Sequence, residues 1–400
     1  MDATGQQPVN RRALGHSPRE IRIVHVINNL GVGGTEHLFA KHIRRLTEHY
    51  PAFSNRIVVL GREETAHGEY LAMLPVRPVF LGFHGRYRNL PASWRCIGQL
   101  RRLLYRAAPD LVHSYLWNAD VFTAIAKMGL AIPQVAHIVD RRGDRNARRS
   151  MTRWRTRLTG RLLRREGNRF VAVSRASAEH ARRQLLLPEG DIVTAHNGIP
   201  VEQFSAPERA GAGDRRRLVV GTLSNLSEEK GHRYLIEAFG RLAQGNDTMD
   251  LEIAGGDRGT ARTELEGMVK RLGLSGRIEF LGRVASAADF YRNIDLFVVP
   301  SLYAEGLPTT ILEAMAARLP VVVTDVGGAS EAIRDGIEGI IVPARDPAAL
   351  ATAMGRLGEA PERRLAMGEA GLRRVKNDFT IEAMTRTIVE RVYRPMTGWE

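Results

Sequence analysis

The stretch Glu305-Gly-Leu-Pro-Thr-Thr-Ile-Leu-Glu313 decides the fold, because it joins a strand pattern to a helix pattern and carries a carboxylate at each end. The apolar run 296–299 before it has the composition of a buried strand. Pro308 favours the first turn of a helix, which Ala-Met-Ala-Ala then continues. The first-turn N–H groups of such a helix suit phosphate oxygens, and each carboxylate can hold sugar hydroxyls. The pattern predicts a nucleotide-sugar site.

The same alternation of strand and helix patterns extends through the chain. Short β-branched runs of four to six apolar residues are typical of strands covered on both faces, and the helices between them make βαβ units. We therefore predict an α/β fold with doubly wound parallel sheets, whose ligands bind at the carboxyl ends of the strands. The predicted strands are 21–27, 56–60, 110–114, 133–139, 169–173, 217–221, 251–254, 277–281, 296–299, 320–323 and 339–342.

Composition narrows the class of protein. A chain of 400 residues with 44% apolar residues is long enough for more than one packed domain. Cys96 is the single cysteine, so no internal disulfide can form, which favours a reducing, cytoplasmic compartment. No run of about 18 apolar residues occurs, so no membrane span is expected.

The positive charge is concentrated in the first half of the chain. Residues 1–205 hold 32 lysines and arginines against 16 acids, and the segment 141–183 alone holds 15 arginines against three acids. A nucleic-acid patch, a surface for anionic lipid or a polyanionic acceptor, and a merely solvated helix would each explain this charge. Aromatic residues for base stacking are sparse there (Trp154 and Phe170), so we favour a membrane-facing surface.

Four further motifs accompany residues 305–313. They are Gly221-Thr-Leu-Ser-Asn-Leu-Ser-Glu-Glu-Lys-Gly231, Val322-Val-Thr-Asp-Val-Gly-Gly328, His196-Asn-Gly-Ile199 and Gly33-Gly-Thr-Glu36. Together these motifs resemble, in type and order, those of the family 4 retaining glycosyltransferases of the GT-B fold (glycosyl transferases group 1). The resemblance extends over roughly residues 20–380. It implies two Rossmann-like domains that face a cleft.

Domain boundaries follow from composition and from this resemblance. The segment 205–214 is small, polar and interrupted by Pro and Gly, as expected of a linker. Residues 1–18 are polar and lack an apolar signal core, so we expect a disordered tail. We expect an acceptor-side domain at 19–204, a donor-binding domain at 215–376 and a C-terminal helix at 377–400 that packs back on the first domain.

The resemblance also implies roles for individual residues. Lys230 is expected to neutralise the diphosphate, Glu313 to hold the ribose hydroxyls and Glu305 to lie beside the transferred sugar. The predicted catalytic residues are Glu305, Lys230 and His137. The predicted donor-binding residues are Gly33, Gly34, Asn225, Lys230, Gly282, Arg283, Glu305, Gly306, Leu307, Thr309, Thr310 and Glu313.

The chain departs from the family pattern at two positions. Asn225 stands where many relatives carry an arginine that gives the phosphates a second cation. Val139 stands where relatives often show a histidine that contacts the donor sugar. His137 lies two residues earlier, on the same strand face, and is either that contact or a satisfied core histidine. His113, at another strand end, is open to the same two interpretations.

The implied function is that of a metal-independent, retaining hexosyltransferase without a cofactor. Its donor would be a nucleoside-diphosphate sugar, UDP-sugar favoured over GDP-sugar. Its acceptor would be a glycan or a lipid-linked saccharide in polysaccharide biosynthesis, used at the inner face of the plasma membrane. No Asp-x-Asp pair occurs, and Glu36 replaces the last glycine of a dinucleotide fingerprint, which disfavours NAD. A nucleotide-sugar epimerase or phosphorylase on the same fold, or a basic nucleic-acid-binding protein, are the alternatives.

Overall fold

The computed structural model describes residues 19–84, 89–139, 150–205, 217–244, 248–257, 261–303 and 305–399, without the side chains of 150–155 and 189. Three predictions therefore fall wholly or partly outside the described residues. These are the tail at 1–18, the linker beyond residue 205 and the most basic stretch, 141–149.

The first half of the chain forms a parallel sheet of seven strands in the described residues, in the order β3-β2-β1-β4-β5-β6-β7. Its strands are β1 Ile21–Ile27, β2 Phe53–Val59, β3 Val79–Phe80, β4 Leu111–Tyr115, β5 Gln134–Ile138, β6 Arg169–Ala172 and β7 Ile192–Thr194. Its helices are α1 Gly34–His49, α2 Gly68–Met73, α3 Leu90–Ala107, α4 Trp117–Ala126, α5 Ser150–Leu163 and α6 Arg175–Leu185. The sequence patterns did not predict β3 and β7, which are only two and three residues long.

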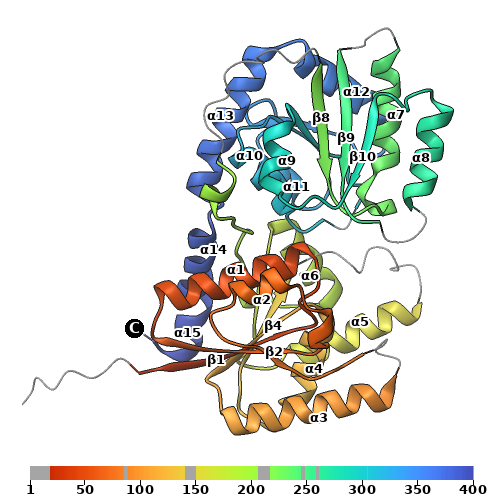
Figure 1. Ribbon diagram of the computed structural model, residues 1–400. Helices are drawn as coiled ribbons and strands as arrows, with labels where there is room; N and C mark the ends of the chain where they lie inside the picture. The colour runs from red at the N-terminus through yellow and green to blue at the C-terminus, as the bar shows by residue number, and fades with distance from the viewer. Residues whose placement is uncertain are drawn as a thin grey trace, which may run out of the picture.

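The second half forms a parallel sheet of six strands in the described residues, in the order β10-β9-β8-β11-β12-β13. Its strands are β8 Leu218–Leu223, β9 Met249–Ala254, β10 Ile278–Gly282, β11 Leu296–Val299, β12 Val321–Thr324 and β13 Gly339–Val342. Its helices are α7 His232–Ala243, α8 Ala261–Arg271, α9 Ala287–Asn293, α10 Thr309–Ala316, α11 Ala329–Ala332, α12 Pro347–Gly358 and α13 Pro361–Asp378. Helices flank both sheets, so the predicted fold class is confirmed (Figure 1).

The end of the chain returns to the first sheet. Helix α13 runs beside the second sheet, and α14 (Ile381–Ile388), a π-helical turn (Val389–Tyr393) and α15 (Arg394–Thr397) lie beside the first (Figure 1). Ile381, Met384 and Ile388 recur on one face of α14 and are buried in the same core as Ile21 and Leu111. The first sheet therefore depends on the last helices to cover its core.

Two segments of chain cross between the sheets side by side. Ile199, after β7, and Thr380, before α14, form a parallel bridge. The Ile199 N–H donates to the carbonyl of Phe379 at 2.9 Å, and the Ile381 N–H donates to the carbonyl of Ile199 at 3.0 Å. Gly198 permits this approach, since a Cβ there would lie 2.2 Å from the Thr380 carbonyl oxygen. The two crossing segments are thus hydrogen bonded to each other.

The carboxyl edges of the two sheets meet. Val139 and Ser174 follow β5 and β6, and Gly306 and Gly328 follow β11 and β12. A Cβ on Gly306 would lie 2.1 Å from the Val139 carbonyl oxygen, and one on Gly328 would lie 2.6 Å from the Ser174 Cβ. The Asn197 amide donates to the Leu307 carbonyl at 2.7 Å. This contact zone is where ligands of such sheets bind.

Candidate active site

Lys230 and Glu305 form an ion pair at the carboxyl edge of the second sheet. The Lys230 ammonium donates to Glu305 Oε1 at 2.6 Å, and the Ser301 hydroxyl donates to the same oxygen at 2.6 Å. The side chains of Lys230 and Glu305 are 27% and 10% exposed, so the pair is partly buried. The attraction within such a pair is screened less than at the surface.

A tight turn delivers Lys230 to this position. Lys230 ends a short 3₁₀ turn, Glu228–Lys230, that leads into α7. Gly231 has φ +70°, and a Cβ there would lie 1.9 Å from the Pro300 carbonyl oxygen, just beyond β11. Only glycine combines that conformation with that approach, so the glycine after the lysine holds the turn against the end of β11.

Glu313 lies in the first two turns of α10 and is 6% exposed. The Tyr291 hydroxyl donates to its Oε2 at 3.0 Å. Burial raises the pKa of Glu313, while the positive charge of Lys41 and hydrogen bonds from Tyr291 and Thr309 oppose that rise. Lys41 belongs to α1 of the first domain, so a positive charge of the first domain acts on the Glu313 carboxylate of the second.

Helix α10 offers an anion site beside Glu313. It begins at Thr309, and its N-cap Pro308 makes no side-chain capping bond. The first-turn N–H groups of Thr309 and Thr310 therefore point along the helix axis toward the carboxyl edge, where the dipole favours an anion. The predicted phosphate-binding loop and the Lys230–Glu305 pair are thus on one edge of one sheet.

Asn225 follows β8, and Gly282 and Arg283 are the last residue of β10 and the residue after it, on the same edge. The Arg283 guanidinium lies beside Gly256, whose Cβ position is 2.7 Å from Arg283 Nε, and the Gly256 carbonyl accepts from the Leu226 N–H at 2.9 Å. The exposed Arg283 therefore lies close to Asn225. It can supply the cation that Asn225 lacks.

Gly33 and Gly34 lie at the start of α1, at the carboxyl edge of the first sheet. A Cβ on Gly33 would lie 2.3 Å from Glu36 Oε2, so the absence of a side chain at Gly33 leaves room for the Glu36 carboxylate in the first turn of α1. Tyr70, which hydrogen bonds to the Gly33 backbone, has a raised pKa, mainly through burial and in part through the charges of Glu69 and Glu313. This end of α1 thus lies within electrostatic range of Glu313.

Gly306 and Leu307, both predicted to contact the donor, lie against residues of the first domain. Gly306 was expected to let a sugar approach the backbone, but its missing Cβ makes room for the carbonyl of Val139 from the first domain. The Leu307 side chain is 3% exposed and packs in the core beneath α10, while its carbonyl accepts from Asn197. Both residues therefore contribute to the contact between domains, and their predicted contacts with the donor stay predictions.

His137 lies in a buried ring cluster. Its Nδ1 is 3.2 Å from His113 Nε2, and its ring stacks on Tyr115 with centroids 5.0 Å apart. The Tyr393 hydroxyl, from the end of the chain, lies 2.5 Å from His113 Nδ1. Burial lowers the pKa of His137 to about 3, so the ring is neutral. Both ring nitrogens of His113 have partners, which favours the core-histidine interpretation for that residue. His137 Nε2 is buried without a hydrogen-bond partner among the described residues, so the catalytic role of His137 stays a prediction.

Sequence reasoning missed Ser301, Tyr291 and Lys41. Ser301 and Tyr291 carry no signal of their own, because only the fold brings them to Glu305 and Glu313. Lys41 carries a weak one: it is one of five lysines in the chain and falls in an otherwise apolar part of a helix. Its side chain is 8% exposed and its ammonium lies 5.4 Å from the centre of the Phe204 ring.

Comparison with known proteins identifies the family. The profile described as Glycosyltransferase Family 4 matches residues 39–203, and the profile described as Glycosyl transferases group 1 matches residues 216–359. The chain therefore carries the two domains of the family 4 glycosyltransferases, on the GT-B fold, as the motifs predicted.

Individual relatives agree. The chain is similar to the lipopolysaccharide core biosynthesis mannosyltransferase LpsB of Rhizobium meliloti, at 32% identity over 48% of this chain and 58% of that protein. It is similar to a phosphatidyl-myo-inositol mannosyltransferase of Mycobacterium leprae, at 27% identity over 88% of this chain and 91% of that protein. The match to LpsB thus spans little more than half of that relative's length.

Solved structures give the same fold. Anabaena Alr3699/HepE in complex with UDP-glucose superposes with a TM-score of 0.79 at 20% identity, over 93% of this chain and 99% of that one. The galactosyltransferase WaaB of the lipopolysaccharide outer core superposes with a TM-score of 0.72 at 14% identity, over 94% and 100%. Among the described residues, no helix is long and apolar enough to cross a membrane, and no three His, Cys, Asp or Glu side chains are grouped to hold a metal ion.

Proposed function

We propose that this chain is a retaining glycosyltransferase that moves a hexosyl group from a nucleoside-diphosphate sugar, UDP-sugar before GDP-sugar, to an acceptor hydroxyl. The observation that carries the proposal is the half-buried Lys230–Glu305 pair, 2.6 Å long, on the same sheet edge as Glu313 and the start of α10. A cation, a helix N-terminus and two carboxylates are the groups that a diphosphate and a sugar require together.

In this proposal the positively charged groups bind the diphosphate and the carboxylates bind the sugar hydroxyls. Lys230 and the N–H groups of Thr309 and Thr310 stabilise the diphosphate as it leaves, and Arg283 adds a second positive charge. Glu313 accepts hydrogen bonds from the two ribose hydroxyls. Glu305 orients the sugar. The bond from the anomeric carbon to the diphosphate breaks while a bond to the acceptor oxygen forms on the same face, and the diphosphate takes the acceptor proton.

The acceptor side of the proposal rests on the first domain. A groove of about 220 Å³ between α3, α4 and α5 is lined by apolar side chains that include Leu90, Trp94 and Trp117. Trp94 is 61% exposed and Leu90 63%. Helix α5, one of the three helices around the groove, also carries the exposed Arg157 and Arg161. Aromatic and arginine side chains together suit an anionic lipid surface, which supports a lipid-linked saccharide as acceptor.

The test is calorimetric titration of the purified chain with UDP, GDP and NAD in the absence of added metal, alongside Glu313→Ala. Binding of one nucleoside diphosphate that is lost in the variant would support the site and identify the base. Binding of none would refute the proposal. Incubation with the matching sugar donor then separates the alternatives, since an epimerase alters the donor without an acceptor and a phosphorylase requires free phosphate.

A further inference from the structure

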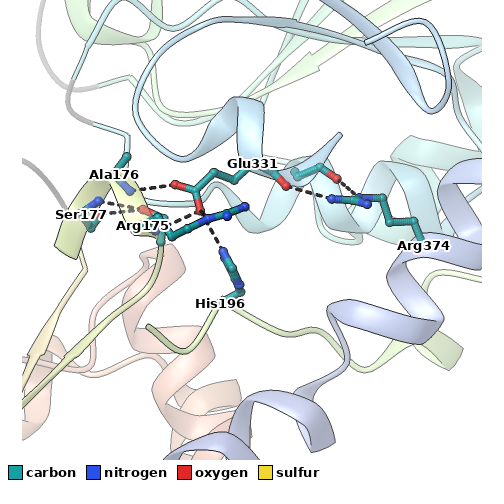
Figure 2. Close-up of polar contacts among 8 residues, drawn as sticks. Arg175, Ala176, Ser177, His196, Glu331 and Arg374 are labelled. Carbon is teal, nitrogen blue, oxygen red and sulfur yellow. Dashed lines mark hydrogen bonds and ion pairs between the residues drawn. The ribbon is translucent and has the colours of Figure 1, made fainter. Parts of the chain in front are cut away.

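Glu331 connects the two domains. It lies on α11 of the second domain, and its side chain is 13% exposed. Its Oε2 accepts from the Arg175 N–H at 2.9 Å, and its Oε1 accepts from the Ala176 N–H at 2.8 Å. Oε2 also lies 2.9 Å from Nε2 of His196 (Figure 2). All three partners belong to the first half of the chain.

The carboxylate completes the N-terminus of a helix in the other domain. Arg175 and Ala176 are the first two residues of α6. Ser174, the N-cap of α6, accepts from the Ser177 N–H at 3.0 Å and so caps a third group of the same turn. Glu331 takes the two N–H groups that α6 cannot satisfy alone, and its negative charge lies at the positive end of the helix dipole.

The charge of Glu331 is secured by its partners. Burial acts to raise its pKa, but hydrogen bonds from His196, Ala176 and Arg175 outweigh burial and lower it. The Arg175 guanidinium lies 3.5 Å from Oε2 but is 79% exposed, so it contributes little. Arg374 of α13 donates to the carbonyls of Ala332 at 2.8 Å and Glu331 at 3.2 Å, which fixes α11 from within the second domain (Figure 2).

The same segment contacts the backbone of Glu305. The Gly328 N–H lies 3.4 Å from the Glu305 carbonyl oxygen. Gly327 has φ +58°, and a Cβ there would lie 2.0 Å from that oxygen. Residues 327–331 are therefore packed between Glu305 on one side and the start of α6 on the other. A movement of α6 away from Glu331 would remove the support behind Glu305.

We propose that Glu331 is a positioning residue that holds the domains closed and fixes the backbone behind Glu305, acting through the N-terminus of α6. The role in turnover rests on the proposed function; the role in closure does not. Opening the interface separates the carboxylate from both N–H groups, so the closed form loses two charge-assisted hydrogen bonds.

Variants on both sides of the interface test this role. Glu331→Gln keeps the size of the side chain and removes its charge. Arg175→Pro removes one N–H donor; proline is accepted at the first position of a helix, and Ser174 before it is already extended, with φ −159° and ψ 162°. Arg175→Ala, which keeps the N–H, is its matched control. Glu369→Gln, which breaks the Arg318–Glu369 pair within the second domain, is the control for Glu331→Gln.

We expect Glu331→Gln and Arg175→Pro each to lower the rate of transfer about tenfold, while the Kd for UDP changes less than about threefold. Small-angle X-ray scattering should give both variants a larger radius of gyration than the wild type, with UDP and without it. Both controls should match the wild type in each measurement.

A radius of gyration and a rate equal to those of the wild type in Glu331→Gln would overturn the proposal. An equal loss in rate and in UDP affinity would also overturn it, because it would assign Glu331 to the donor site. If the wild type binds no nucleoside diphosphate, the proposed function fails. The scattering comparison without nucleotide then still decides whether Glu331 holds the domains closed.

Discussion

Replacing Glu305 by glutamine should tighten the binding of UDP while it slows transfer. In the structure, Lys230 is already paired with Glu305 at 2.6 Å, so an incoming diphosphate competes for the ammonium with a carboxylate. Breaking a buried pair costs about 3–5 kcal/mol and an exposed pair about 0–1 kcal/mol. With Lys230 27% exposed and Glu305 10% exposed, the cost lies between these limits, at about 2 kcal/mol.

Glutamine keeps a neutral hydrogen bond to Lys230, so it relieves part of that cost, about 1–2 kcal/mol. The Kd for UDP should then fall by about five- to thirtyfold. Transfer should fall about a hundredfold or more, because the sugar loses the carboxylate that orients it. Titration calorimetry measures the first effect and product formation the second. Glu228→Gln, at an exposed position of the same turn as Lys230, is the charge-matched control.

UDP binding that is weaker in Glu305→Gln than in the wild type would refute the reasoning. So would an equal gain in Glu228→Gln, because the effect would then come from net charge near the site and not from release of Lys230 from its partner.

Three further predictions follow from the site. Lys41→Met should raise the pKa of Glu313 further, because it removes the positive charge that opposes the effect of burial. UDP binding needs the ionised carboxylate, so on acidification the variant should lose UDP binding at a higher pH than the wild type. The two proteins should differ less in their binding of 2′-deoxy-UDP, which lacks one of the two ribose hydroxyls. Gly306→Ala should enlarge the radius of gyration and slow transfer, because its Cβ would lie 2.1 Å from the Val139 carbonyl oxygen; an unchanged scattering curve would contradict this. Arg283→Met should weaken UDP binding about five- to tenfold by calorimetry and leave the binding of uridine unchanged, since its charge acts on the phosphates.

The sequence was sufficient where the relevant information is local. Parallel strands buried on both faces leave unbroken apolar runs, and residues 305–313 carry both carboxylates and the helix start within nine positions. The predicted fold class and family were therefore correct. The short strands β3 and β7 were missed, because two or three residues are too few to show an alternation of apolar and polar residues.

The surroundings of several predicted site residues depend on contacts between distant segments. His137 was given a catalytic role because it lies on the same strand face as Val139, and the sequence could not predict that Tyr393 hydrogen bonds to the neighbouring His113, 280 positions away. Gly306 was expected to let a sugar approach the backbone, and the sequence could not predict that the Val139 carbonyl lies against it. Glu331 follows the Gly327-Gly328 pair with nothing to mark it, because its partners are backbone N–H groups of another domain.

The return of α14 to the first sheet has a consequence for biosynthesis. One core cluster of the second domain, from Val220 to Met367, comes from a continuous stretch of sequence that can fold once it has left the ribosome. The first domain is translated earlier, but one of its core clusters lacks Ile381, Met384, Ile388 and Tyr393 until α14 and the π-helical turn have been translated. The half of the protein that is made first is therefore completed last, and a nascent chain that stops short of α14 leaves the apolar face around Ile21 and Leu111 uncovered, as a target for chaperones and proteases.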